Sequence, residues 1–159
     1  MDYRKEYEKW LASPALSEDE RAELRALEGN DKEIKARFYG PLEFGTAGLR
    51  GTMYTGLHNM NRHVIRWATQ GFANVIRAEG TEAMQKGVAV CMDCRNHSAE
   101  FARETACVMA ANGIHVRLFE SLRPTPELSF AVREYGCQAG VNVTASHNPK
   151  EYNGYKVYW

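Results

Sequence analysis

Residues 87–119, GVAVCMDCRNHSAEFARETACVMAANGIHVRLF, alternate between the hydrophobic periods of strands and helices. The nearly continuous apolar run 87–92 predicts a buried strand, and residues 114–119 predict the next one. Between them we expect a helix that begins at Asn96 or Ser98. A strand, a helix and a second strand in this order are typical of an α/β domain with a largely parallel sheet.

The same alternation continues on both sides of this segment. Asn61 can cap one helix, and Thr125 can cap another that has Pro126 at its first position. Residues 139–144 predict a third buried strand, and the alternating residues 155–159 predict a last strand. The chain from residue 61 onward is therefore expected to fold as one α/β unit.

A helical arm is expected to precede this unit, with the arm at residues 1–43 and the domain at residues 44–159. The first helix has an apolar stripe at helical spacing, formed by Tyr3, Tyr7, Trp10 and Leu11. Ser17 and Glu20 have the spacing of a capping box, and residues 31–38 predict a third short helix. We expect the arm to pack on the main body.

The charge and hydrophobicity of the chain exclude several classes of partner. The 159 residues contain 20 Lys and Arg against 20 Asp and Glu, which gives no basic surface for nucleic acid or an anionic membrane. The apolar runs are too short to span a bilayer, and residues 1–6 are not followed by the apolar run of a signal peptide. We therefore expect a cytoplasmic protein with neither kind of partner.

The four cysteines are interpreted as reduced thiols, since several of them lie in apolar runs. Cys91 and Cys94 nevertheless form a C-x-x-C, which can be a redox pair or half of a zinc site. No second C-x-x-C or H-x-x-H completes a zinc ribbon. The redox and zinc interpretations are kept as minor alternatives.

Chemistry is expected at the carboxyl ends of the strands, where open α/β sheets bind ligands. The loop after the third strand contains Ser146, His147 and Asn148, and a turn at Asn153-Gly154 is expected to bring Lys156 back to the same place. These side chains could simply satisfy one another in a polar turn. Neighbouring side chains diverge, so a hydrolase triad fits poorly. A serine that carries a phosphoryl group needs amide and cationic donors and usually a divalent metal, and this loop offers such donors.

Four motifs resemble those of the α-D-phosphohexomutases, the phosphoglucomutase and phosphomannomutase superfamily. TASHNP with YNGYKVY, at residues 144–158, closely resembles the phosphoserine loop of that family. In the same order along the chain come its N-terminal signature at 44–51, its D-x-R-x-x-S segment at 93–98 and its PTP turn at 124–126. The arm looks most like that of the phosphoglucomutase branch, which includes phosphopentomutases and glucose-1,6-bisphosphate synthases. The fold implied is a three-layer α/β/α domain with a mostly parallel mixed sheet.

The resemblance also implies site residues. Ser146 would be the phosphoserine, and one of its phosphate oxygens would bind Mg²⁺. His147 and Lys156 would act as acid, base or electrostatic helpers, and Arg50 and Asn148 would bind substrate. Arginine suits that role because its planar fork matches phosphate oxygens.

Asp93 and Arg95 are interpreted as a structural pair that braces the cleft, with a direct role as the alternative. Residues 56–59 depart from the family pattern.

The implied activity is that of a phosphoglucomutase, which interconverts glucose 1-phosphate and glucose 6-phosphate through a bisphosphate intermediate. Glucose 1,6-bisphosphate would be its activator. Full enzymes of the family have four domains and this chain resembles only the first, so we expect it to be inactive alone and to need the C-terminal domains as partners. Alternatives are a phosphomannomutase, a phosphopentomutase, a glucose-1,6-bisphosphate synthase or a non-catalytic phosphosugar-binding module, with hexose or pentose phosphates as ligands.

Overall fold

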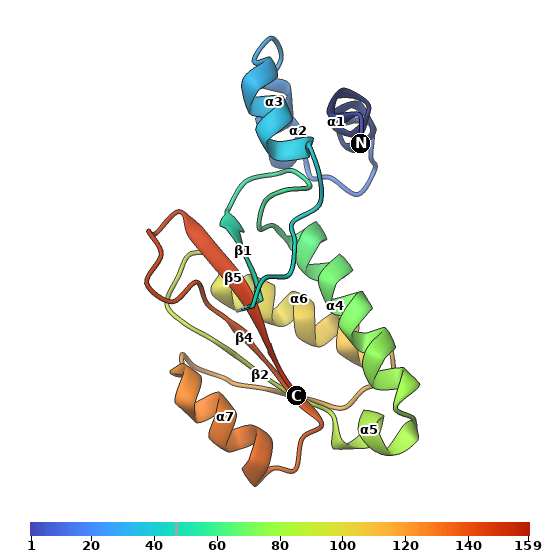
Figure 1. Cartoon of the computed structure of the whole chain (residues 1–159), viewed down its shortest axis with the longest axis vertical. Coiled ribbons are helices and arrows are strands. Elements are labelled where there is room, and N and C mark those ends of the chain that lie inside the picture. Colours follow the sequence, from blue (N-terminus) through green and yellow to red (C-terminus); the bar gives the residue numbers. More distant parts are fainter. Residues whose placement is uncertain (47) are drawn as a thin grey trace.

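The computed structural model describes residues 1–46 and 48–159, and within them five strands form one mixed sheet in the order β1-β5-β4-β2-β3 (Figure 1). The strands are β1 (Leu49–Thr52), β2 (Val88–Met92), β3 (Val116–Leu118), β4 (Ala139–Val143) and β5 (Tyr152–Tyr158). Strand β2 pairs in parallel with β3 and β4, whereas β5 is antiparallel to both β4 and β1. Strand β5 therefore runs against the other four, which confirms the mostly parallel mixed sheet.

Helices cover both faces of this sheet, so the predicted three layers are confirmed (Figure 1). In the body of the domain these are α4 (Arg62–Ala78), α5 (Thr81–Lys86), α6 (Ser98–Ala111) and α7 (Thr125–Glu134). Helices α4 and α6 pack together on one face, and α7 lies on the other. In the described part of the chain, no helix combines the length and the apolar character that crossing a membrane requires.

Strand β2 shows why the sequence has an unbroken apolar run there. Val88 and Val90 belong to the buried cluster beneath α4 and α6, whereas Ala89 and Cys91 pack with Leu128 of α7. Successive side chains of a strand point to opposite faces, so a strand covered on both sides must be apolar throughout. The sheet thus has a separate hydrophobic core on each of its two faces.

The N-terminal arm consists of α1 (Tyr3–Leu11), α2 (Glu18–Arg25) and α3 (Asp31–Phe38), which surround their own core of buried residues that includes Leu24 and Phe38. The capping box of α2 is present, because Ser17 and Glu20 bond each other's backbone N–H groups. Glu20 also accepts a hydrogen bond from Arg62 at 2.6 Å, and its other carboxylate oxygen lies 3.1 Å from the ring of His63. These contacts join the arm to the first turn of α4.

Several predicted boundaries differ from the structure. Strand β1 and helix α5 were not predicted, because each is only four to six residues long and β1 includes Gly51. Helix α6 begins at Ser98, one of the two predicted starts, and it is capped by His97, which has a left-handed conformation with a φ of 60°.

Thr125 was expected to cap α7, but Pro124 is the cap. The Thr125 hydroxyl instead accepts a hydrogen bond from Asn142 of β4 at 2.7 Å. The buried side-chain amide of Asn142 needs a hydrogen-bond partner, and the Thr125 hydroxyl is that partner instead of the cap of α7.

Candidate active site

The loop between β4 and β5 is closed by short hydrogen bonds within itself. The backbone N–H of Asn148 donates to the carbonyl of Ala145 at 3.1 Å, and that of Tyr152 donates to Pro149 at 3.0 Å. The chain therefore reverses direction at residues 148–151, ahead of the predicted turn. Asn153 and Gly154 lie inside β5, which corrects the expectation that they form the turn.

Ser146 lies at the exposed tip of this loop in an uncommon conformation. Its φ is 58°, in the left-handed region, and its N–H donates to the hydroxyl of Thr144 at 3.0 Å. Its Oγ is 3.4 Å from Nδ1 of His147, which is long for a hydrogen bond but within reach. The expectation that these neighbouring side chains diverge is therefore wrong. An exposed hydroxyl beside an imidazole is accessible to a substrate that approaches from solvent.

Arg50 comes to the same loop from β1. Its Nη1 donates to the side-chain oxygen of Asn148 at 3.2 Å, and its Nε is buried without a protein partner among residues 1–46 and 48–159. Both side chains are half-buried. A cationic group with N–H capacity to spare thus lies beside the loop that carries Ser146.

Glycines allow the backbones around this loop to approach closely. A Cβ added to Gly48, whose φ is 93°, would lie 2.1 Å from the carbonyl oxygen of Tyr155. A Cβ on Gly154 would lie 2.5 Å from the carbonyl of Thr144 and 2.8 Å from that of Leu49. The absence of a side chain at Gly48 therefore lets β1 fit against β5.

Asp93 and Arg95 form an ion pair, and Arg95 holds the loop by its backbone carbonyls, as the bracing interpretation predicted. Arg95 Nε lies 3.4 Å from Asp93, and the guanidinium donates to loop carbonyls that include Ser146 at 2.9 Å. Asp93 in turn accepts a hydrogen bond from the Ser98 hydroxyl at 2.9 Å. The buried Asn153, which the sequence reasoning took for a turn residue, donates to that same hydroxyl at 3.0 Å. Its position two residues before Tyr155 on a strand could have indicated a buried amide.

Lys156 is half-buried on β5, where it pairs with Asn142 of β4. Within the described residues its side chain has no hydrogen bond or ion pair, whereas Arg50, Asn148, Ser146 and His147 are linked in two contacting pairs. The structure therefore places Lys156 on the strand that leaves the loop but does not join it to the other predicted site residues.

The cysteine alternatives receive no support. Burial raises the pKa of the Cys91 thiol to about 12, the opposite of the low-pKa thiolate that a redox pair requires. All four cysteines are free, with Cys94 exposed. In the part of the chain that the structure describes, no three His, Cys, Asp or Glu side chains gather as a metal site would need.

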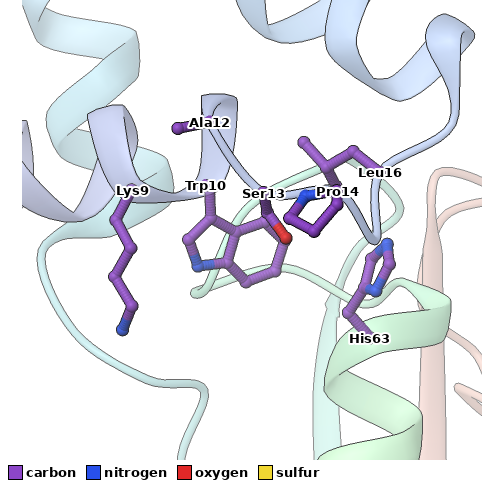
Figure 2. Close-up of a pocket in the computed structure, with 7 residues that line it drawn as sticks. All are labelled: Lys9, Trp10, Ala12, Ser13, Pro14, Leu16 and His63. Carbon is purple, nitrogen blue, oxygen red and sulfur yellow. The ribbon is translucent and has the colours of Figure 1, made fainter.

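A separate pocket of about 440 Å³ lies where the arm meets α4 (Figure 2). Trp10 and Leu16 line it from the arm, and the His63 ring borders it from the first turn of α4. None of its lining residues comes from the loop of residues 144–151. Burial lowers the pKa of His63, so the ring next to this pocket is mainly neutral at pH 7. The pocket is therefore a feature of the junction between arm and body.

Comparison with known proteins gives one consistent family. Residues 41–159 match the phosphoglucomutase/phosphomannomutase alpha/beta/alpha domain I. The chain is 43% identical over 138 residues to human phosphopentomutase, with 83% of this chain and 22% of that protein covered. It is 41% identical over 128 residues to the phosphoglucomutase of Staphylococcus saprophyticus, with 80% and 23% covered.

Solved structures agree with this result. The crystal structure of a phosphoglucomutase/phosphomannomutase family protein from Burkholderia thailandensis superposes with a TM-score of 0.61 and 28% identity, and covers 72% of this chain and 25% of that one. The chain thus spans about a fifth to a quarter of the length of the relatives that it matches.

Proposed function

The chain belongs to the phosphoglucomutase/phosphomannomutase family, and we propose that it carries the phosphoserine of a phosphoglucomutase-type enzyme at Ser146. One observation carries this proposal: an exposed serine in a left-handed conformation lies in a loop that is hydrogen-bonded to an arginine from β1, the edge strand that pairs with β5. Strained non-glycine conformations persist where the surrounding structure holds them, and they cluster at functional sites.

In the proposed reaction, the hydroxyl oxygen of a sugar monophosphate attacks the phosphorus of phosphorylated Ser146. A new O–P bond forms, the P–Oγ bond breaks, and the proton of the sugar hydroxyl is lost while Oγ gains one. Ser146 Oγ then attacks the phosphorus of the other phosphate of the resulting bisphosphate: a new Oγ–P bond forms, the sugar O–P bond breaks, Oγ loses its proton and the released sugar oxygen gains one. His147, 3.4 Å from Oγ, is the nearest side chain that could hold the proton, and Arg50 and Lys156 would counter phosphate charge.

The proposal includes Mg²⁺, which when bound would neutralise charge on the transferring phosphoryl group. Mg²⁺ prefers six oxygen ligands in near-octahedral geometry. The described residues contain no cluster of three carboxylate, histidine or cysteine side chains, so a phosphate oxygen on Ser146 is the ligand that this chain would offer. These residues do not fit a complete magnesium site by themselves, and the protein groups named above carry the steps assigned to this chain.

The preferred substrate is proposed as glucose 1-phosphate and glucose 6-phosphate, with glucose 1,6-bisphosphate as activator. Relatives named phosphopentomutase and phosphoglucomutase are almost equally similar, at 43% and 41% identity. Pentose phosphates are therefore one alternative to compare directly, and mannose phosphates are another, because a further relative is named phosphomannomutase. Because phosphoryl transfer needs groups that converge from several sides, the 159-residue chain alone should be inactive and should need the remaining domains of its enzyme.

A coupled assay of the full-length enzyme tests this proposal. Glucose 1-phosphate, mannose 1-phosphate and ribose 1-phosphate are compared at equal concentration, with Ser146→Ala as the test variant and Ser129→Ala, on α7, as its control. We expect turnover of a sugar phosphate that Ser146→Ala abolishes and Ser129→Ala leaves within two-fold. Full activity in Ser146→Ala, or no activity of the wild type on any of the three, would overturn the proposal.

A further inference from the structure

Arg95 uses its whole guanidinium to hold the loop that carries Ser146. Nη1 donates to the carbonyls of Pro149 at 2.8 Å and Tyr152 at 3.0 Å, and Nη2 donates to those of Ser146 at 2.9 Å and Asn148 at 2.7 Å. Nε faces Asp93 at 3.4 Å. The four N–H groups of Nη1 and Nη2 therefore each have a carbonyl acceptor, and Nε lies in an ion pair. A lysine, with three donors on one nitrogen, could not satisfy the same four carbonyls.

This contact determines which way the loop's peptide groups point. In a trans peptide the C=O and the N–H of the same unit point in opposite directions. With the carbonyls of Ser146 and Pro149 turned toward Arg95, the N–H groups of His147 and Lys150 point away from it. Within residues 1–46 and 48–159, neither of these N–H groups donates to a protein acceptor. Two backbone donors thus remain free on the side of the loop opposite the guanidinium, and such donors suit anions.

The hydrogen bond from Arg95 to the Ser146 carbonyl also stabilises the strained backbone of Ser146. A left-handed conformation costs a non-glycine residue free energy, so it persists only when its neighbours hold both of its peptide groups. The N–H of Ser146 is held by the Thr144 hydroxyl at 3.0 Å, and its carbonyl is held by Arg95 at 2.9 Å. Thr144 is buried next to β4 and belongs to the sheet end. Arg95 is therefore the side chain that fixes the second peptide group.

We infer that Arg95 is a positioning residue for Ser146: by binding three carbonyls of the loop and that of Tyr152 at the start of β5, it holds Ser146 left-handed and turns the His147 N–H toward the phosphoryl side. The inference rests on the proposed function for its link to phosphoryl transfer. Arg95 touches backbone oxygens and not the reacting atoms, so its role is indirect. Asp93, itself bonded to the Ser98 hydroxyl at 2.9 Å, fixes the guanidinium against the start of α6.

Arg21 provides a matched control in the arm. It also donates to several backbone carbonyls, those of Leu11, Ser13 and Leu16, and its Nε also lies 3.4 Å from a carboxylate, that of Glu18. Its side chain is 18% exposed, against 12% for Arg95. Replacement of either arginine by lysine should therefore disturb the fold to a similar degree, and only one replacement should disturb Ser146.

The first experiment is an NMR comparison of the wild-type chain, Arg95→Lys and Arg21→Lys. A left-handed residue gives a strong NOE between its own amide and Hα protons. We expect this NOE at Ser146 in the wild type and in Arg21→Lys, and its loss in Arg95→Lys. Asp93→Asn keeps Arg95 but removes its carboxylate partner, so it should weaken the NOE, and it replaces Arg95→Lys as the test variant if that protein does not fold. An unchanged NOE in a folded Arg95→Lys, or in Asp93→Asn when it is the test variant, would overturn the inference.

The second experiment measures the full-length enzyme. We expect Arg95→Lys to lower kcat at least ten-fold with KM within two-fold, whereas Arg21→Lys with a similar Tm leaves kcat within two-fold. Equal losses in the two variants would overturn the positioning role. If the wild-type enzyme takes no phosphate on Ser146, the proposed function fails, and the NOE comparison still decides whether Arg95 holds the loop.

Discussion

Arg50 Nη1 donates a hydrogen bond to Asn148 Oδ1 at 3.2 Å, although 98 positions separate the two residues in the chain. One residue lies on β1 and the other in the loop between β4 and β5. This bond connects two of the motifs that resemble the family and places a cationic group beside Ser146. It is the long-range contact on which the proposed active site depends.

The coupling between Arg50 and Asn148 should be measurable in a double-mutant cycle. Arg50→Ala, Asn148→Ala and the double variant are compared by urea unfolding. Because both side chains are half-buried, we expect a coupling free energy of about 1 kcal/mol. Strictly additive effects of the two substitutions would mean that the bond does not form in solution.

Gly48→Ala should destabilise the chain more than Gly29→Ala does. Both glycines have a positive φ, 93° and 83°, so each substitution introduces the same kind of backbone strain. A new Cβ at Gly48 would meet the Tyr155 carbonyl at 2.1 Å, whereas at Gly29 it would meet nothing within 4 Å. We expect a loss of about 1 kcal/mol for Gly29→Ala and more than 2 kcal/mol for Gly48→Ala. Equal losses in thermal unfolding would show that β1 does not lie against β5 as described.

Stability should fall at alkaline pH because of Cys91. Burial raises the pKa of this thiol to about 12 in the folded chain, while in the unfolded chain it keeps its ordinary value near 9. Between these values the unfolded state loses the proton and the folded state retains it, so rising pH favours unfolding. The loss is up to about 1.4 kcal/mol per pH unit above pH 9.

Urea unfolding at pH 8 and pH 10.5 checks this prediction, with Cys91→Ala as the comparison. The decrease in unfolding free energy between the two pH values should be larger in the wild type than in the variant. The same decrease in both would contradict a buried, protonated thiol at this position.

Lys156→Met should lower turnover of the full enzyme far more than it lowers stability. Within the described residues the Lys156 side chain has no hydrogen bond or ion pair that its loss would break. If it stabilises charge on the phosphoryl group, kcat should fall about 100-fold to 1000-fold. Lys150→Met, at an exposed position of the loop that precedes β5, serves as the control and should stay within two-fold. An unchanged kcat in Lys156→Met would refute the electrostatic role.

Much of the fold could be predicted from periodicity and caps, because strands covered on both faces, such as β2, must be apolar throughout. The capping box at Ser17 could also be predicted, because it depends on residues only three positions apart. Strand β1 could not be predicted, since its four residues become a strand only by pairing with β5, 100 to 106 positions later in the chain.

The candidate site, like the fold, could be predicted only in part. The loop that holds Ser146 was recognisable as a motif, but its geometry depends on long-range contacts that no local pattern encodes. Arg95 reaches four carbonyls more than fifty positions away, and sequence reasoning could assign it only a general bracing role. The distance of 3.4 Å between Ser146 and His147 follows from the left-handed backbone at Ser146, which the letters of the motif do not reveal.

The central claim is that Ser146 carries the phosphoryl group, and the mass of the protein tests it most directly. The full-length enzyme is incubated with glucose 1,6-bisphosphate, its intact mass is measured, and the phosphorylated residue is mapped by fragmentation. We predict the addition of one phosphoryl group, mapped to Ser146 and absent from Ser146→Ala. A phosphate that maps to another residue, or a wild-type mass that does not change, would contradict the account.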